Sequence, residues 1–501
     1  MARAPEEEVV FGSAAASPAV RLLAMARNSA SGLLTVAFFA VVVLAAVPMG
    51  ANRDWAWAPI AVIIGLFSVA AAAGLGSRSG FEVVERERLP LIALTVCFLL
   101  FVLFGLFQMA VWAPLSGSAW FYETAARLLG GAHAPVPDLA IDASRDTLLK
   151  CLTCGAIFLM ARALCRDRRR ARLLLLMFVA GAVLVVVYGF LMQLQTHSCY
   201  VGSYLKKVSA YASTDRCVMS GTFVSSNSFG CYCGMALMAA MALVFASRRR
   251  HGDVPYGYDE DDEESFVASF TGFRVTMLAV CLLLLGGLLF SASRASLAAT
   301  LASAGVLSLL MLRGRWHSRP GLARLFVGGA IVVGLLVLVI AGNTIVGKMA
   351  RASDDWDRVR IWLAAVQAIE MSPWLGWGLG SFADIYAVLQ PASLPQANNL
   401  AHSTPLETMV EVGLPMALFG YAIVLIPCGV ALFGALTRRR AHRYLPGAAF
   451  AVALVPILHS MVDFSLQMPA IGFIVSAVLG MGWTQAFGRR ERRSHGFTPW
   501  E

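Results

Sequence analysis

Long apolar stretches alternate with short, arginine-rich polar segments along almost the whole chain. A stretch of about 17 to 25 apolar residues is long enough to cross a bilayer as a helix. About twelve such stretches are present, which predicts an all-α polytopic membrane protein. They lie near residues 31–50, 55–75, 89–112, 147–165, 173–194, 222–246, 275–292, 296–312, 325–342, 411–436, 445–461 and 470–487. Arg294 interrupts a run that is too long for one span, so we expect a turn there.

The positions of the basic residues predict the orientation of these spans, because Lys and Arg are retained in cytoplasmic loops. The first apolar run begins about thirty residues into the chain and no cleavage site follows it, so we interpret it as the first span. Both termini are then expected in the cytoplasm. The cytoplasmic segments of this topology contain 27 of the 40 Lys and Arg residues, and they are 1–30, 76–88, 166–172, 247–274, 313–324, 437–443 and 488–501.

Composition narrows the class of protein further. Apolar residues make up 58% of the chain and charged residues 14%, which excludes a soluble enzyme, a disordered chain and a disulfide scaffold. The formal net charge of +10 would suggest nucleic acid as partner in a soluble protein, whereas here most of it orients the spans. Three long segments, 113–146, 195–221 and 343–410, remain outside the cytoplasm, and we expect the functional site there.

The exterior segment 195–221 contains Cys199, Cys217 and Arg216. Both cysteines would face an oxidising compartment, so a disulfide between them and two free thiols are both compatible with the sequence. No histidine cluster in the exterior segments resembles a metal site, and we expect neither a metal nor a cofactor.

Arg294, Arg358 and Arg360 are the most informative cations near the exterior boundary. Arg294 is either a side chain that reaches out of the membrane at a turn or a fixed cation that receives a phosphate. Residues 358–369 have apolar positions at helical spacing, which predicts an amphipathic helix at the membrane surface. Arg358 shares the face of Trp362, four residues later, whereas Arg360 lies on another face and is solvated or supports the site.

The glycine cluster at 376–380 superficially suggests a dinucleotide loop, but no strand precedes it. We expect these glycines to permit a tight turn and close backbone approach.

Three ionisable groups near the last spans are further candidates. His402 is either a structural interfacial residue or a general base next to bound phosphate, since imidazole titrates near pH 6.5. Glu407 and Glu411 share a helix face and either orient His402, contact an acceptor or cap the helix. His459 and Asp463 form either a structural hydrogen-bonded pair, which we favour, or part of a cavity lining.

Together these segments resemble the O-antigen ligase and polysaccharide polymerase superfamily of bacterial inner-membrane glycosyltransferases. Each motif is weak alone, but their order and spacing match from about residue 220 to 480. The matching pieces are Gly221-Thr222-Phe223 with Asn227, Ser293-Arg294-Ala295, Arg358 four before Trp362, Pro373 through Phe382, and His402 through Gly413.

The resemblance implies about twelve spans, cytoplasmic termini and a helical periplasmic segment, 343–410, before the last three spans. It also implies transfer of a glycan from undecaprenyl diphosphate to an acceptor hydroxyl, with inversion and without a metal. His402 would be the base, and Arg294 and Arg358 would bind the diphosphate. Arg216, Arg360, Glu407 and Glu411 are supporting candidates. Ser403 departs from the Asn that commonly follows this His, which affects the acceptor contacts.

The resemblance divides the chain into a cytoplasmic tail (1–30), an N-terminal transmembrane region (31–220), a ligase/polymerase-like region (221–487) and a second cytoplasmic tail (488–501). The implied partners are the lipid-linked glycan donor, a saccharide or lipid-linked acceptor and membrane lipids, with no nucleic acid. A polymerase of surface polysaccharide repeat units is slightly favoured over a ligase of O-antigen to lipid A-core. A transporter or flippase of lipid-linked sugars is the alternative from another class.

Overall fold

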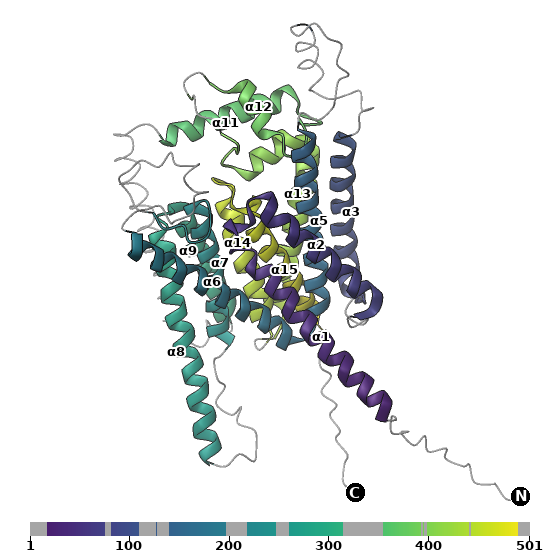
Figure 1. Ribbon diagram of the computed structural model, residues 1–501, viewed down its shortest axis with the longest axis vertical. Coiled ribbons are helices and arrows are strands. Elements are labelled where there is room, and N and C mark those ends of the chain that lie inside the picture. The colour runs from purple at the N-terminus through teal and green to yellow at the C-terminus, as the bar shows by residue number, and fades with distance from the viewer. Residues whose placement is uncertain are drawn as a thin grey trace, which may run out of the picture.

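The computed structural model describes residues 18–75, 82–109, 127, 140–196, 218–246, 260–313, 354–391, 394, 398–439 and 442–488, with the backbone alone at 18–30, 74–75, 195–196, 260–271 and 354–356. These residues form helices, turns and loops and no strand, which confirms the all-α prediction (Figure 1). The helices are α1 (Pro18–Leu44), α2 (Asp54–Ala70), α3 (Glu85–Gln108), α5 (Ile141–Leu164), α6 (Arg168–Thr196), α7 (Ser226–Ala246), α8 (Glu260–Phe290), α9 (Arg294–Leu312), α11 (Asp354–Met371), α12 (Phe382–Leu389), α13 (Thr404–Thr437), α14 (Tyr444–His459) and α15 (Pro469–Phe487).

Most predicted spans correspond to helices of the structure. Among the described residues, nine helices are long and apolar enough to cross a membrane, and the segments Ser31–Leu44 and Tyr444–His459 are shorter apolar helices. The expected span at 325–342 lies outside the described residues. The long apolar run divides where predicted, because α8 ends at Phe290 and α9 begins at Arg294.

Helices α7 and α15 form the centre of the bundle. In their most apolar windows 78% and 83% of the positions are buried, against 17% for α3 and 22% for α8, which expose apolar faces as a lipid-facing helix does. Small residues allow this close packing. A Cβ added to Gly482 of α15 would lie 2.3 Å from the Cβ of Ala449 in α14. Glycine and alanine at such contacts therefore allow the inner helices to approach each other closely.

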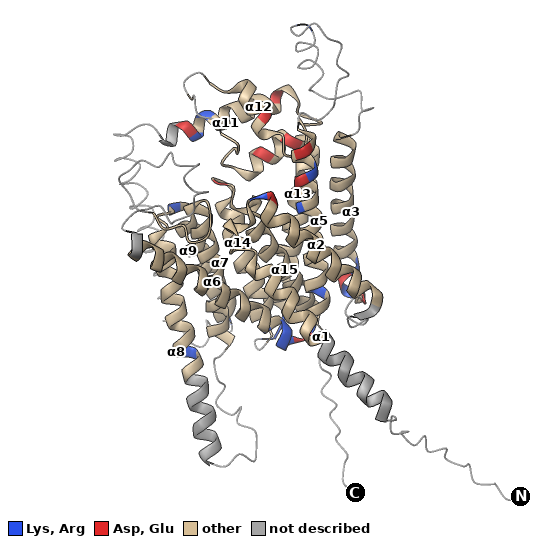
Figure 2. Cartoon of the chain, in the orientation of Figure 1, with Lys and Arg blue, Asp and Glu red and all other residues tan. Residues whose placement is uncertain are grey.

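The arginine-rich segments meet at one end of the bundle. Arg170 donates to Ser31 Oγ at 3.0 Å, and Arg438 donates to the Gly488 carbonyl at 2.7 Å. Charged residues lie mainly near the two ends of the bundle, and a largely uncharged band separates them (Figure 2). This arrangement agrees with the alternating topology, while the side of the membrane that each end faces stays a prediction.

A buried ion pair holds three helices together at the same end. Arg162 of α5 lies 2.6 Å from Glu87 of α3, and both side chains are almost fully buried. The second carboxylate oxygen of Glu87 accepts a hydrogen bond from Trp483 Nε1 of α15 at 2.9 Å. No local sequence pattern indicates this pair, since 75 residues separate its two members.

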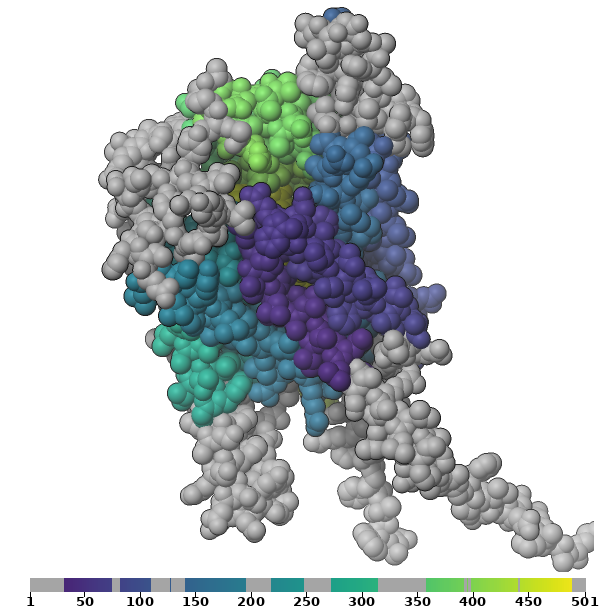
Figure 3. Space-filling model, in the orientation of Figure 1, coloured from purple at the N-terminus to yellow at the C-terminus, as the bar shows by residue number. Residues whose placement is uncertain are grey.

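Helices α11 and α12 form a cap at the opposite end of the bundle (Figure 1). The cap has a small core of its own, in which Ile361, Ala365, Trp377, Phe382 and Tyr386 are buried. Helix α11 packs against the beginning of α13. In the space-filling view the green cap lies above the purple N-terminal helices, and yellow C-terminal residues are visible in a recess between them (Figure 3).

Candidate functional site

His402 lies in the turn that leads from the cap into α13. Its φ of 52° is in the left-handed region, which is uncommon for a residue with a side chain. Two contacts fix the preceding residue: the Ala401 N–H donates to Glu407 Oε2 at 2.8 Å, and the Ala401 carbonyl accepts from Trp362 Nε1 at 3.0 Å. These contacts of the preceding residue therefore hold His402 in a strained conformation.

The His402 ring faces a buried carboxylate. Its Nδ1 lies 3.7 Å from Asp463 Oδ1, and the Phe464 ring meets it edge-on with centroids 5.1 Å apart. Asp463 is 1% exposed and His402 27% exposed. Because Nδ1 itself is buried, the accessible part of the imidazole is the remainder of the ring, which carries Nε2.

Asp463 is the polar centre of the site. Its Oδ2 accepts a hydrogen bond from Asn227 Nδ2 at 2.6 Å, and its Oδ1 accepts from the Phe464 N–H at 2.8 Å. Burial alone would raise the pKa of Asp463, but the neighbouring His402 and His459 and the Phe464 N–H bring it below its ordinary value. Asp463 is therefore ionised at neutral pH.

His459 is fully buried beside this carboxylate, with its Nε2 3.9 Å from Asp463 Oδ2. That separation is too long for a hydrogen bond. The favoured expectation of a hydrogen-bonded His459–Asp463 pair is therefore wrong in its geometry, since neither ring nitrogen of His459 has a hydrogen-bond partner among the described residues.

Helix α11 directs Arg358 toward the Asp463 loop. Arg358 is half-buried and its Nη1 donates to the Val462 carbonyl at 3.4 Å. Trp362, one turn later, contacts the His402 turn through Ala401. Arg360 is exposed and pairs with Asp357 at 3.7 Å. The two arginines thus lie on different faces, as the helical spacing predicts.

Arg294 begins α9 and connects to the same loop through Asn227. Ser293 caps the helix, and its hydroxyl donates to Ser296 Oγ at 2.8 Å. Ser296 Oγ in turn donates to the Asn227 carbonyl at 3.0 Å. The Arg294 side chain is exposed and makes no hydrogen bond or ion pair within the described part of the chain. A chain of contacts therefore joins the turn of Arg294 to Asp463 and His402.

The glycine cluster forms the tight turn that the sequence predicts. Gly376, Gly378 and Gly380 have φ of 68°, 115° and 81°. Helix α13 is interrupted at Gly413, which has a φ of 73°. The glycine turn packs against the α13 backbone there so closely that a Cβ at Gly376 would lie 2.3 Å from the Glu411 carbonyl oxygen. The Gly378 N–H donates to the Glu411 carbonyl at 3.0 Å, and Gln108 of α3 donates to the same carbonyl at 2.9 Å.

The remaining sequence candidates have different positions. Glu407 and Glu411 are both buried. The Glu407 carboxylate accepts a hydrogen bond from Ala401 in the His402 turn, and the Glu411 carbonyl accepts one from Gly378 in the glycine turn. Arg216, Cys199 and Cys217 lie outside the described residues. Asn227 was noticed only as part of a motif, because 236 residues separate it from Asp463 and no local pattern links them.

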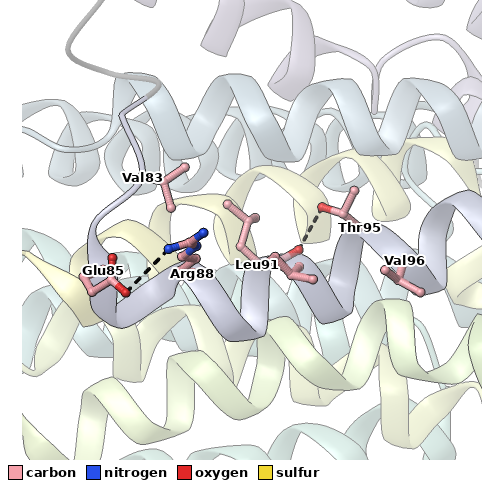
Figure 4. A pocket seen from close by; sticks show the side chains of 7 residues that line it. Val83, Glu85, Arg88, Leu91, Thr95 and Val96 are labelled. Carbon is pink, nitrogen blue, oxygen red and sulfur yellow. Dashed lines mark hydrogen bonds and ion pairs between the residues drawn. The ribbon is translucent and has the colours of Figure 1, made fainter.

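Two other observations concern ligands. A groove of about 480 Å³ on α3 is lined by Val83, Glu85, Arg88, Leu91, Ile92, Thr95 and Val96, near the arginine-rich end of the bundle (Figure 4). None of these residues is among those described above around His402 and Asp463. Within the ranges described, no group of three or more His, Cys, Asp or Glu residues is arranged to hold a metal ion.

Comparison with known proteins gives one family. Residues 279–420 match the family model described as O-antigen ligase. The match includes Arg294, Arg358 and His402, whereas Asn227 and Asp463 lie outside it. No curated protein matches the chain. Residues 279–420 are therefore similar to the O-antigen ligase family, and they lie within a polytopic helical fold.

Proposed function

We propose that the protein is a metal-independent, inverting membrane glycosyltransferase that moves a glycan from undecaprenyl diphosphate to a saccharide hydroxyl during surface polysaccharide synthesis. The O-antigen ligase domain supports the class of reaction. The observation that carries the mechanism is an accessible imidazole, His402, beside the buried carboxylate of Asp463.

His402 acts as the general base in this proposal. It takes the proton of the acceptor hydroxyl while the hydroxyl oxygen attacks the anomeric carbon. The bond from that carbon to the diphosphate oxygen breaks, and the diphosphate leaves with the electron pair. Attack opposite the leaving group inverts the anomeric centre. Ionised Asp463 is a positioning residue that orients the ring and stabilises the imidazolium.

Arg294 and Arg358 bind the diphosphate. Charge grows on the leaving group as the glycosidic bond breaks, and planar guanidinium groups stabilise it through paired hydrogen bonds. Arg294 is exposed and makes no polar contact among the described residues, and Arg358 is half-buried beside the Asp463 loop. Exposed Arg360, paired with Asp357, is not assigned a role.

The proposed location is the bacterial inner membrane, with the site facing the periplasm. The reason is the charge distribution: the arginine-rich segments gather at the end of the bundle away from His402, and such segments are retained in the cytoplasm.

Product analysis distinguishes the candidate functions. The purified full-length protein is incubated with an undecaprenyl-diphosphate oligosaccharide, alone and with lipid A-core. A ladder without added acceptor supports a polymerase, and a single species joined to lipid A-core supports a ligase. Absence of any transfer product under both conditions contradicts the enzyme proposal and favours a transporter of lipid-linked sugars.

The diphosphate assignment has a separate test with a matched control. Arg358→Lys keeps the charge but removes the planar fork, and we expect donor affinity to fall by about tenfold. Arg360→Lys, on the exposed face of the same helix, should leave the affinity unchanged. Equal donor affinity in the two variants and the wild type would contradict the role of Arg358.

A further inference from the structure

Four arginines converge at the end of the bundle that lies away from His402. Arg168 and Arg172 come from the first turns of α6, Arg313 follows α9, and Arg443 precedes α14. Arg443 donates to the Leu310 carbonyl at 3.3 Å, which brings it to the end of α9. Burial first and then the charge of Arg313 lower the pKa of Arg443, so the two guanidinium groups influence each other. The charges of Arg168 and Arg172 act on the adjacent Tyr444.

Within the described ranges, this cluster has no acidic ion-pair partner. Among the residues described, none of the four arginines forms an ion pair; Arg168 instead lies 3.2 Å from His442 Nε2. Arg443 Nε is buried without a hydrogen-bond partner. Like charges that converge in this way repel one another unless an anion lies among them. Arginines that only orient the spans in the membrane do not have to lie close to one another. Arg169 and Arg439, which are exposed to solvent, are of this kind.

The surface beside the cluster is apolar. The Arg172 guanidinium lies over the Phe273 ring of α8, 5.0 Å from its centroid. Val275, Leu278 and Leu282 follow along α8 and are 61%, 52% and 70% exposed. Because this helix is long and apolar enough to span the membrane, these side chains face the lipid region. A ligand with a negative head and an apolar tail matches both parts of the surface.

We propose that Arg168, Arg172, Arg313 and Arg443 bind the phosphate of an anionic phospholipid. Basic pockets between transmembrane helices on the cytoplasmic side accept such headgroups, and guanidinium forks match phosphate oxygens. The site is distinct from the proposed glycan-donor site, since the two lie at opposite ends of the bundle, and it does not depend on the proposed reaction.

Native mass spectrometry of the full-length protein in detergent tests the site, with dioleoylphosphatidylglycerol as probe and dioleoylphosphatidylcholine as the neutral comparison. The wild type should retain the anionic lipid selectively. Arg168→Gln with Arg443→Gln should weaken its binding at least about tenfold. Arg169→Gln with Arg439→Gln removes the same charge from the same two segments and should bind as the wild type does. Equal lipid binding in both double variants overturns the proposal.

A second double variant distinguishes loss of lipid binding from misfolding. Arg172→Gln with Arg313→Gln changes two exposed side chains and leaves the contacts of Arg168 and Arg443 in place. It should also bind the anionic lipid more weakly than the control. A parallel titration with inorganic phosphate separates the two sources of phosphate. Displacement of the lipid by millimolar phosphate would overturn the lipid assignment in favour of a soluble anion.

Discussion

At the scale of single residues, the site depends on contacts that join distant parts of the chain. The sequence indicates His402, Arg294 and Arg358 from residue type and spacing. It does not indicate that Asn227 and Asp463 share a hydrogen bond, since hydrogen bonding across 236 residues leaves no local pattern. The sequence does not predict the strained φ of His402 either, because it results from the contacts of the preceding Ala401 with Glu407 and Trp362.

Asp463→Asn tests whether the buried carboxylate positions His402. The amide keeps the shape of the side chain but loses the charge that orients the imidazole and stabilises its protonated form. We expect kcat to fall by about 10²- to 10⁴-fold with little change in donor affinity. Initial rates of glycan transfer measure this, with exposed Asp384→Asn as the control. A kcat equal to that of the wild type would remove Asp463 from the mechanism.

Asn227→Ala tests the hydrogen bond behind Asp463. Loss of this donor removes one contact that stabilises the carboxylate, so the pKa of Asp463 should rise. Asp463 is then protonated at a higher pH, so the pH profile of its carboxyl protonation, followed by carbon NMR of labelled aspartate, shifts upward relative to the wild type. Ser226→Ala, at the neighbouring position of α7, is the control. Superimposable pH profiles for the wild type and Asn227→Ala contradict the argument.

At the scale of helices, hydrophobic patterning accounts for most of the fold. It predicts the apolar spans, the turn at Arg294 and the opposite faces of Arg358 and Arg360. It does not predict how α13 breaks at Gly413 to receive the glycine turn, because that fit depends on backbone atoms of two segments. The turn itself follows from the glycines, but its partner does not.

Gly376→Ala tests this fit. The new Cβ would lie 2.3 Å from the Glu411 carbonyl oxygen at a φ of 68°, so both contact and backbone conformation are unfavourable. The strained φ alone costs about 1 to 3 kcal/mol, and thermal unfolding in detergent should show a lower midpoint. Gly429→Ala, in the same α13 with open space around it, should be neutral or slightly stabilising. Equal destabilisation by both substitutions would argue against the close approach.

At the scale of the whole molecule, the bundle has a His402 end and an arginine-rich end with different interactions. The His402 end contains the cap and the Asp463 hydrogen bonds, and the arginine-rich end is held together by Glu87, Arg162 and Trp483. Charge counting predicts which loops gather at the second end. The buried ion pair there could not be predicted, because 75 residues separate Glu87 from Arg162 and no local pattern links them.

Arg162→Met tests the contribution of this pair to stability. It leaves Glu87 buried without its cation, so we expect a loss of about 3 to 5 kcal/mol in the free energy of unfolding. The exposed pair Arg145–Asp142 is the matched control, and Arg145→Met should cost less than about 1 kcal/mol. Chemical denaturation in detergent measures both, and similar losses would show that burial of the pair is unimportant.

His402 removes the acceptor proton in the proposed reaction, and His402→Ala tests this role most directly. Purified wild type and variant are supplied with an undecaprenyl-diphosphate oligosaccharide and acceptor, and both transfer rate and donor binding are measured. We expect transfer to fall by at least about 10²-fold while donor binding is preserved. Transfer at the wild-type rate by a folded His402→Ala protein would contradict it.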